Sequence, residues 1–205
     1  RATFGRLQSQ LHAVLDPQAF YRAKLLEQRQ RHAKFEDTPF SLEPNCKESP
    51  GGLRDLQVLL WASQAAGRGR SWTDLGRAGL LTPEEMSTLR RTERTLKSIR
   101  ARVHLVAGRR EDRLVFDVQR TVAEAMGLKG SPTRLASELL MQSYYRAAKA
   151  VTQLNTIVLL SIEQRLMPSD PAPAVVLDSV FTSRRELLDI ADDQALLREQ
   201  PEARS

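Results

Sequence analysis

Residues 42–57 hold the chain's densest group of side chains that could do chemistry, in the order Leu-Glu-Pro-Asn-Cys-Lys-Glu-Ser-Pro-Gly-Gly-Leu-Arg-Asp-Leu-Gln. Gly51 and Gly52 directly precede a run with helical spacing. Two glycines there would leave backbone N–H groups uncovered at the positive end of the helix dipole, which is an arrangement that binds anions. Lys47 and Arg54 flank the glycines as cations. The pattern therefore indicates a site for a phosphate group or a nucleotide.

Glu43 stands near the start of the same segment, at the end of a short extended run. It could present a carboxylate to a metal ion, so that the segment would contain the elements expected around a metal-bound triphosphate. The residues alone leave a plainer interpretation open. In that interpretation the glycines form a tight turn that leads into a helix, and Arg54 and Asp55 are exposed or paired.

Other familiar chemistries find little support in the sequence. Cys46 is the single cysteine and lies in a proline-rich loop, with no Gly-x-Ser-x-Gly or Gly-x-x-x-x-Gly-Lys-Ser/Thr motif elsewhere, so we interpret it as an inert thiol. His12, His32 and His104 are each isolated, without a second ligand at metal-binding spacing. His104 lies beside an apolar stripe, which favours a helix-packing role.

Helices must position the candidate site. Asp16-Pro17 predicts a helix over residues 16–35, after a short helix around residues 4–15. Prolines and glycines interrupt residues 36–52, which leave room for a short extended piece over 40–43. A helix over 53–66, ended by Gly67, should follow.

The second half of the chain is also predicted to be helical. Thr73-Asp74 caps a single turn, Thr82-Pro83 begins a helix through to Gly108, and residues 116–126 form a shorter helix. Ser131-Pro132 should open the longest helix, which reaches Met167. Three prolines at 168, 171 and 173 then read as a linker, followed by one short strand over 174–177 and one or two helices.

Composition narrows the class of protein. The 205 residues carry a formal charge of +6, which divides into +10 over residues 1–167 and −4 over residues 168–205. No apolar run approaches the roughly 20 residues that span a bilayer, which excludes a membrane helix, and the single cysteine and absence of a signal peptide favour the cytoplasm. The basic surplus suits a nucleotide or an acidic partner, but no nucleic-acid motif accompanies it, so nucleic acid is an unlikely partner.

A family resemblance sharpens these expectations. Residues 43–57 resemble the Glu-Pro-Asn-x-Lys-x-x-Pro-Gly-Gly-Leu-Arg-Asp signature of the bifunctional uridylyltransferase/uridylyl-removing enzymes that modify the PII nitrogen-signalling protein. The strings Arg-Val-His-Leu at 102–105, Gly-Arg at 108–109 and Asp-Arg-Leu-Val-Phe-Asp-Val-Gln at 112–119 are similar to a second block of that family. The resemblance covers roughly residues 16–165 in the same order.

The resemblance implies a mainly α, bundle-like chain with one short strand at residues 40–43 left from a polymerase-beta-type nucleotidyltransferase domain. Residues 1–52 would end that domain, 53–167 would form the following helical domain, and 168–205 would be a linker and the start of the next unit. Because the chain begins at Arg1 rather than Met, we expect a piece of a longer protein.

The resemblance also implies functions. The family transfers UMP from UTP to a tyrosine of PII and removes it again under control by glutamine. Glu43 would be a catalytic residue and Mg²⁺ ligand, and Lys47, Gly51, Gly52 and Arg54 would bind the nucleotide. The family's Asp-x-Asp metal pair and the hydrolase's His-Asp dipeptide are missing from this sequence, so the chain alone should be inactive and help to shape the transferase site. The alternative is a non-catalytic helical module that docks PII or neighbouring domains.

Overall fold

The computed structural model describes residues 15–168, 175–176, 181–184 and 187–190. The chain divides into two compact units, residues 1–166 and residues 167–205. The first is helical in its described part, which confirms the mainly α class. Its helices are α2 Pro17–Ala33, α3 Leu53–Ala65, α4 Trp72–Arg77, α5 Pro83–Ala107, α6 Phe116–Ala125 and α7 Ala136–Leu166.

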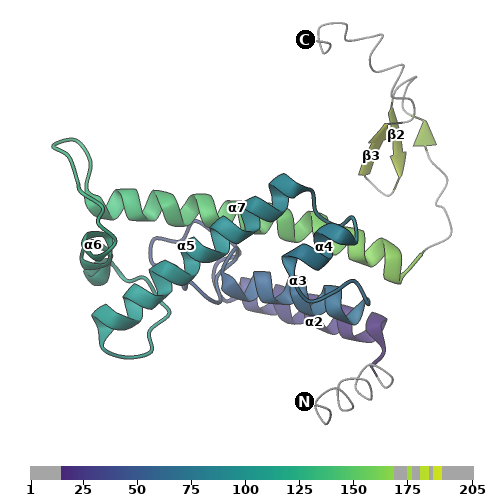
Figure 1. Ribbon diagram of the computed structural model, residues 1–205, viewed down its shortest axis with the longest axis horizontal. Coiled ribbons are helices and arrows are strands. Elements are labelled where there is room, and N and C mark those ends of the chain that lie inside the picture. The colour runs from purple at the N-terminus through teal and green to yellow at the C-terminus, as the bar shows by residue number, and fades with distance from the viewer. Residues whose placement is uncertain (1–14, 169–174, 177–180, 185–186, 191–205) are drawn as a thin grey trace, which may run out of the picture. The chain divides into compact units, whose positions relative to one another are not determined.

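Helix α7 is the packing centre of this unit, because α2, α3, α5 and α6 all contact it (Figure 1). Its fully buried side chains include Leu140, Tyr144, Val151, Val158 and Ile162. Successive members of this set are separated by four or seven residues, so they lie on one side of the helix. The long helix thereby supplies a continuous apolar stripe against which the shorter helices pack.

Helix α5 follows its sequence signals closely. Thr82 and Glu85 form the capping box, Pro83 is the first helical residue, and Gly108 ends the helix in the left-handed conformation at φ 63°. The stripe expected from the sequence is buried at Leu89, Leu96, Ile99 and Val103. These contacts place the second motif block, which begins in this helix, against the centre of the unit.

The extended strand predicted over residues 40–43 is wrong, since these residues form no strand. Their backbone bonds to helix side chains instead of to another strand. The Ser41 carbonyl accepts a hydrogen bond from the Tyr145 hydroxyl at 3.1 Å, and the Leu42 carbonyl accepts one from Gln119 Nε2 at 2.9 Å. The segment is thus a turn and bend that is bonded to side chains of α6 and α7 without sheet pairing.

Two helix starts also differ from prediction. Residues 131–134 form a turn in which the N–H of Ser131 and the N–H of Arg134 bond each other's carbonyl, so α7 begins at Ala136. Ser71, rather than Thr73, caps α4, and its hydroxyl accepts from the Asp74 N–H at 3.2 Å. In both places a helix follows the predicted cap region, but its first residue differs by a few positions from the one predicted.

The described strands of the second unit are β1 Val175–Val176, β2 Phe181–Arg184 and β3 Leu187–Ile190, paired antiparallel in that order. Strand β1 falls within the strand predicted over 174–177. The one or two helices predicted in this region carried no bounds. They do not lie at residues 181–184 or 187–190, which form strands, because short apolar runs do not distinguish a strand from a helix. The predicted helix around residues 4–15 and His12 lie outside the described residues.

Two predictions about organisation meet the structure here. The described residues before 52 pack in the same compact unit as those after it, while the assignment of 1–52 to a nucleotidyltransferase domain stays a prediction. Among the described residues, no helix is both long and apolar enough to cross a membrane.

Candidate functional site

The loop before α3 is organised by one asparagine. Asn45 Oδ1 accepts hydrogen bonds from the backbone N–H groups of Lys47 at 3.0 Å and Glu48 at 2.8 Å. The Asn45 N–H donates to Ser49 Oγ at 2.9 Å, and Ser49 is buried. Asparagine side chains favour such turns because they mimic a backbone carbonyl. The motif's asparagine therefore sets the path along which Lys47 and Glu48 are presented.

The expectation of uncovered N–H groups at the start of α3 is wrong. Gly51 N–H donates to Asp55 Oδ2 at 2.7 Å, and Gly52 N–H donates to the Ser49 carbonyl at 2.8 Å. The next two N–H groups donate to carbonyls of the same loop, Leu53 to Cys46 at 3.1 Å and Arg54 to Lys47 at 2.8 Å. The backbone of this helix start is satisfied within the chain, so any anion at the motif must be held by side chains.

The glycine pair has a packing reason. Gly51 has a φ of 76°, and a Cβ there would lie 2.3 Å from the carbonyl oxygen of Ala148 on α7. A Cβ on Gly52 would meet the carbonyl oxygens of Lys47 and Ser49 at 2.8 Å. Any larger residue would push the loop away from α7 or open the turn. The glycines therefore allow the loop to approach α7 closely.

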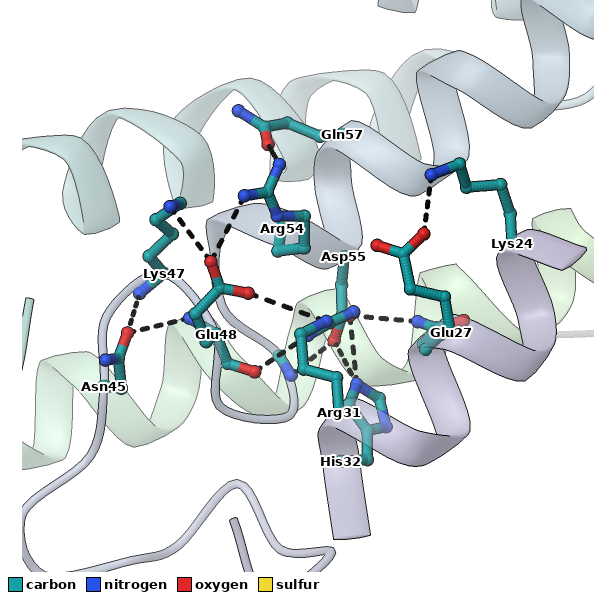
Figure 2. Close-up of polar contacts among 12 residues, drawn as sticks. Lys24, Glu27, Arg31, His32, Asn45, Lys47, Glu48, Arg54, Asp55 and Gln57 are labelled. Carbon is teal, nitrogen blue, oxygen red and sulfur yellow. Dashed lines mark hydrogen bonds and ion pairs between the residues drawn. The ribbon is translucent and has the colours of Figure 1, made fainter. Parts of the chain in front are cut away.

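Asp55 is the buried centre of the motif, with 1% of its surface exposed. Oδ1 accepts from Gln28 Nε2 at 2.9 Å and from Arg31 at 2.6 Å, and His32 Nε2 lies 3.0 Å away (Figure 2). Oδ2 accepts the Gly51 N–H. Burial alone would raise the pKa of this carboxyl, but the His32 and Arg31 contacts outweigh it and lower the pKa. Asp55 therefore stays ionised and pairs the turn, as one interpretation expected, but with Arg31 rather than Arg54.

The buried network extends to α7 through Asn155. Its Oδ1 accepts from Gln28 Nε2 at 2.9 Å, and its Nδ2 donates to the Asp55 carbonyl at 3.1 Å. Gln28 belongs to α2, Asp55 to α3 and Asn155 to α7. One connected set of hydrogen bonds therefore holds the three helices and the glycine loop together.

Cations gather around Glu48 at the surface of the motif (Figure 2). Glu48 Oε1 lies 3.0 Å from Lys47 Nζ and 3.2 Å from an Arg54 guanidinium nitrogen, and Oε2 lies 3.7 Å from Arg31 Nε. Partial burial would raise the pKa of Glu48, but Lys47 and Arg54 outweigh it and lower the pKa. The structure thus brings the predicted residues Lys47 and Arg54 to one point. Sequence reasoning missed Arg31 and Glu48, although Glu48 lies inside the motif between the two cations.

Glu43 lies apart from these cations. Glu43 Oε1 accepts a hydrogen bond from the Phe116 N–H at 2.9 Å, and Oε2 lies 3.2 Å from an Arg113 nitrogen. Phe116 is the first residue of α6, so the carboxylate occupies the positive end of that helix. In the described structure Glu43 acts as a cap that joins the loop to α6, and its catalytic and metal-binding roles stay predictions.

The two motif blocks meet in space. Cys46 N–H donates to the Asp112 carbonyl at 2.7 Å, and Leu114 N–H donates to the Pro44 carbonyl at 2.9 Å. The Asp112 carboxylate in turn accepts from Arg100 Nε at 2.6 Å. Residues 44–46 and 112–114 therefore form one short bridged structure, which brings the two motif blocks together although they are far apart in the sequence.

Two isolated residues behave as the sequence analysis proposed. Cys46 is fully buried, and burial raises its pKa to about 12, so its thiol is inert in the native fold. His104 Nε2 lies 2.9 Å from Asp112 Oδ1, which supports a packing and pairing role on α5.

The described residues do not form a magnesium site by themselves. Mg²⁺ is held by several oxygen ligands, usually including carboxylates. In the part of the chain that the structure describes, no three His, Cys, Asp or Glu side chains gather closely enough to hold a metal ion. Glu43 is a single carboxylate already paired with Arg113. These residues could contribute at most one ligand to a site completed elsewhere.

Comparisons with known proteins agree with the motif blocks. The family model described as "GlnD PII-uridylyltransferase" matches residues 19–159. The chain is similar to proteins named bifunctional uridylyltransferase/uridylyl-removing enzyme. It is 55% identical to that of Cupriavidus pinatubonensis over 99% of this chain and 23% of that protein. It is 51% identical to that of Bordetella parapertussis over 97% of this chain and 23% of that protein.

The protein from Ralstonia nicotianae with the same name is 55% identical over 90% of this chain and 22% of that protein. The chain thus spans less than a quarter of the length of these relatives. No solved structure matches it significantly. The family match covers both motif blocks and the helices that bring them together, and the chain therefore belongs to the GlnD PII-uridylyltransferase family.

Proposed function

We propose that this chain is the helical segment of a bifunctional enzyme that transfers UMP from UTP to a tyrosine of the PII protein and removes it again. Glutamine would act as the effector of the enzyme, and the enzyme would be located in the cytoplasm. The relatives that carry the same segment are named for both activities. Because the segment spans less than a quarter of those proteins, the remaining catalytic groups, including the other magnesium ligands, would lie outside it.

Within that enzyme, the segment's role is to shape the transferase site, and it should be inactive alone. One observation carries this proposal: the motif loop is anchored to α2, α6 and α7, and beside it Lys47, Glu48 and Arg54 meet with side chains that stay 18 to 25% exposed. A rigid loop with polar groups at its surface is what positions a substrate for a neighbouring catalytic domain. Lys47 and Arg54 would contact the nucleotide's phosphates, and Gly51 and Gly52 would give the loop its shape.

The test for a catalytic Glu43 is Glu43→Gln in the full-length enzyme. If Glu43 completes the metal site, UMP transfer should fall by at least about 100-fold while uridylyl removal continues. The matched control is Glu111→Gln, which is the same chemical change at a neighbouring glutamate. Glu111 accepts a hydrogen bond from the backbone N–H of Arg113 at 3.0 Å. Normal transfer by Glu43→Gln would leave Glu43 as the cap of α6 alone.

The second candidate is a docking module for PII or a neighbouring domain. It is favoured by large apolar side chains exposed within or next to the motif blocks, namely Leu42 at 66%, Leu105 at 80% and Phe116 at 57%. Such a module would bind its partner without nucleotide. Equal binding of PII by the chain with and without UTP, lost in Leu105→Asp, would favour docking over site shaping.

A further inference from the structure

The cation cluster, defined as Arg31, Lys47 and Arg54, converges on a single carboxylate, Glu48 (Figure 2). The three cations come from α2, the loop and α3, so the fold alone brings them together. Their side chains are 10, 18 and 24% exposed. Three like charges at partly buried positions destabilise the fold unless a negatively charged group lies close enough to neutralise them.

Arg31 is the most informative member, because it is nine-tenths buried and incompletely bonded. Its two terminal nitrogens donate to Asp55 Oδ1 at 2.6 Å and to the Glu48 carbonyl at 2.8 Å. Its Nε finds no hydrogen-bond acceptor among the described residues and lies 3.7 Å from Glu48 Oε2. A buried donor without an acceptor is rare in proteins and calls for a partner. This donor lies beside the Glu48 carboxylate but too far from it for a hydrogen bond.

The charges leave a surplus for that partner. The buried Asp55 pairs with Arg31, and Glu48 is the carboxylate that pairs with Lys47 and Arg54. Counting both carboxylates, the cluster retains one net positive charge. A glutamate offers two oxygens, whereas a phosphate group offers three acceptor oxygens and a larger charge. Arginine and lysine together are suited to such a group.

We propose that the cation cluster is a binding site for a phosphate group and that Glu48 is an internal counter-ion, displaced when the phosphate enters. Glu48 can leave because it lies on the loop and is one quarter exposed. The site assigns roles to Arg31 and Glu48 in addition to Lys47 and Arg54. Its ligand class is a pyrophosphate or the phosphate tail of a nucleotide.

Trp61 gives this site a reporter. The Arg54 guanidinium carbon lies 5.5 Å from the centre of the Trp61 ring, and Lys24 Nζ lies 5.1 Å from it. An anion that draws Arg54 toward itself changes the charge next to the indole. Ligand binding at the cluster should therefore alter tryptophan fluorescence.

The choice of a nucleotide as the natural ligand rests on the proposed function, whereas phosphate binding itself does not. The test titrates the 205-residue chain with inorganic pyrophosphate. Calorimetry and tryptophan fluorescence measure the binding. Glu48→Gln removes the competing charge while keeping the side chain's size. It should lower the dissociation constant for pyrophosphate by about fivefold or more, because the phosphate no longer has to displace an ion-paired carboxylate, and an ion pair at roughly 4 Å in a watery site corresponds to about that factor.

Two variants make the result specific. Lys47→Gln should weaken pyrophosphate binding by a similar factor, because it removes a cation without touching the buried Asp55 network. Glu124→Gln is the matched control: it removes a carboxylate paired with Arg120 at 2.9 Å on the exposed face of α6. This control should leave the dissociation constant unchanged. Urea unfolding of each variant confirms that the fold is retained.

The outcomes separate the two proposals. If Glu48→Gln binds no pyrophosphate at low millimolar concentration, or binds it no more tightly than Glu124→Gln does, the phosphate site is refuted whatever the full-length enzyme does. If binding follows the expected charge order but the full-length enzyme transfers no UMP, the site stands and the proposed function fails. Tighter binding of UTP than of inorganic triphosphate identifies a nucleotide as the ligand, and equal binding identifies the phosphates alone.

Discussion

Replacing Asp55 with asparagine is the sharpest test of the buried network. The substitution keeps the size of the side chain but removes its charge and turns one acceptor oxygen into a donor. Gln28 and Arg31 donate to Oδ1, and the Gly51 N–H donates to Oδ2. Either orientation of an asparagine amide therefore sets its NH₂ group against at least one donor.

The expected cost follows from burial and charge. Asp55 is 1% exposed, and Arg31 pairs with it at 2.6 Å. Breaking a buried ion pair by removing one partner costs about 3–5 kcal/mol, because the remaining charge is left without its counter-ion. A domain's total stability is about 5–15 kcal/mol. Asp55→Asn should therefore lose a large share of the free energy of unfolding at pH 7.

Urea unfolding of the 205-residue chain, followed by helical circular dichroism, measures this loss. The matched control is Asp37→Asn, because Asp37 is exposed at a φ of 54°, a conformation that asparagine tolerates. Its free energy of unfolding should change by less than about 0.5 kcal/mol. A loss below about 1 kcal/mol for Asp55→Asn would refute the central role assigned to this carboxylate.

The pH dependence provides an independent check. The folded pKa of Asp55 lies below its ordinary value of 3.8, so the unfolded chain takes up the proton first. The stability due to ionised Asp55 is present in full well above pH 4 and is lost as the pH falls through the folded pKa. The stability difference between the wild type and Asp55→Asn should therefore shrink as the pH falls below about pH 4. A difference that does not shrink below that pH would contradict this assignment.

Further predictions concern the loop's packing and its buried thiol. Gly51→Ala should lower the free energy of unfolding by about 1–3 kcal/mol more than Gly127→Ala, in urea titrations, since both positions have positive φ but only the first would clash with Ala148. Equal losses would mean that backbone conformation alone requires the glycine. Cys46 should react with a disulfide reagent at pH 8 at least about 100-fold more slowly in the native chain than in urea, because burial raises its pKa to about 12. Rapid native labelling would contradict the burial.

Much of the fold was predictable because its signals are local. Helix α5 begins at Thr82-Pro83 and ends at Gly108, as the capping pattern predicts. Helix α2 begins at Asp16-Pro17. Periodic apolar residues mark the faces that pack on α7 because helical spacing alone decides which side chains share a face. The errors at 40–43 and 131–135 fall on short segments whose hydrogen bonds go to distant helices or to an unforeseen turn.

The candidate site was only half predictable. Lys47 and Arg54 were identified because they flank the glycine pair in the sequence. Arg31 lies about 20 residues away on another helix, and no local pattern links it to Glu48. The N–H groups thought to be uncovered are bonded by carbonyls of the loop's own turn and by Asp55. Whether a polar group is satisfied depends on atoms brought together by folding.

The helical class, most helix limits and the family follow from the sequence alone, because caps, periodicity and the two motif blocks are patterns of neighbouring residues. The surroundings of the motif residues follow only from the tertiary structure. It joined residues 44–46 to 112–114, buried Asp55 among three helices and directed three cations at Glu48. These features depend on distances between segments far apart in the chain, and those distances are set by packing against α7 and not by any local preference.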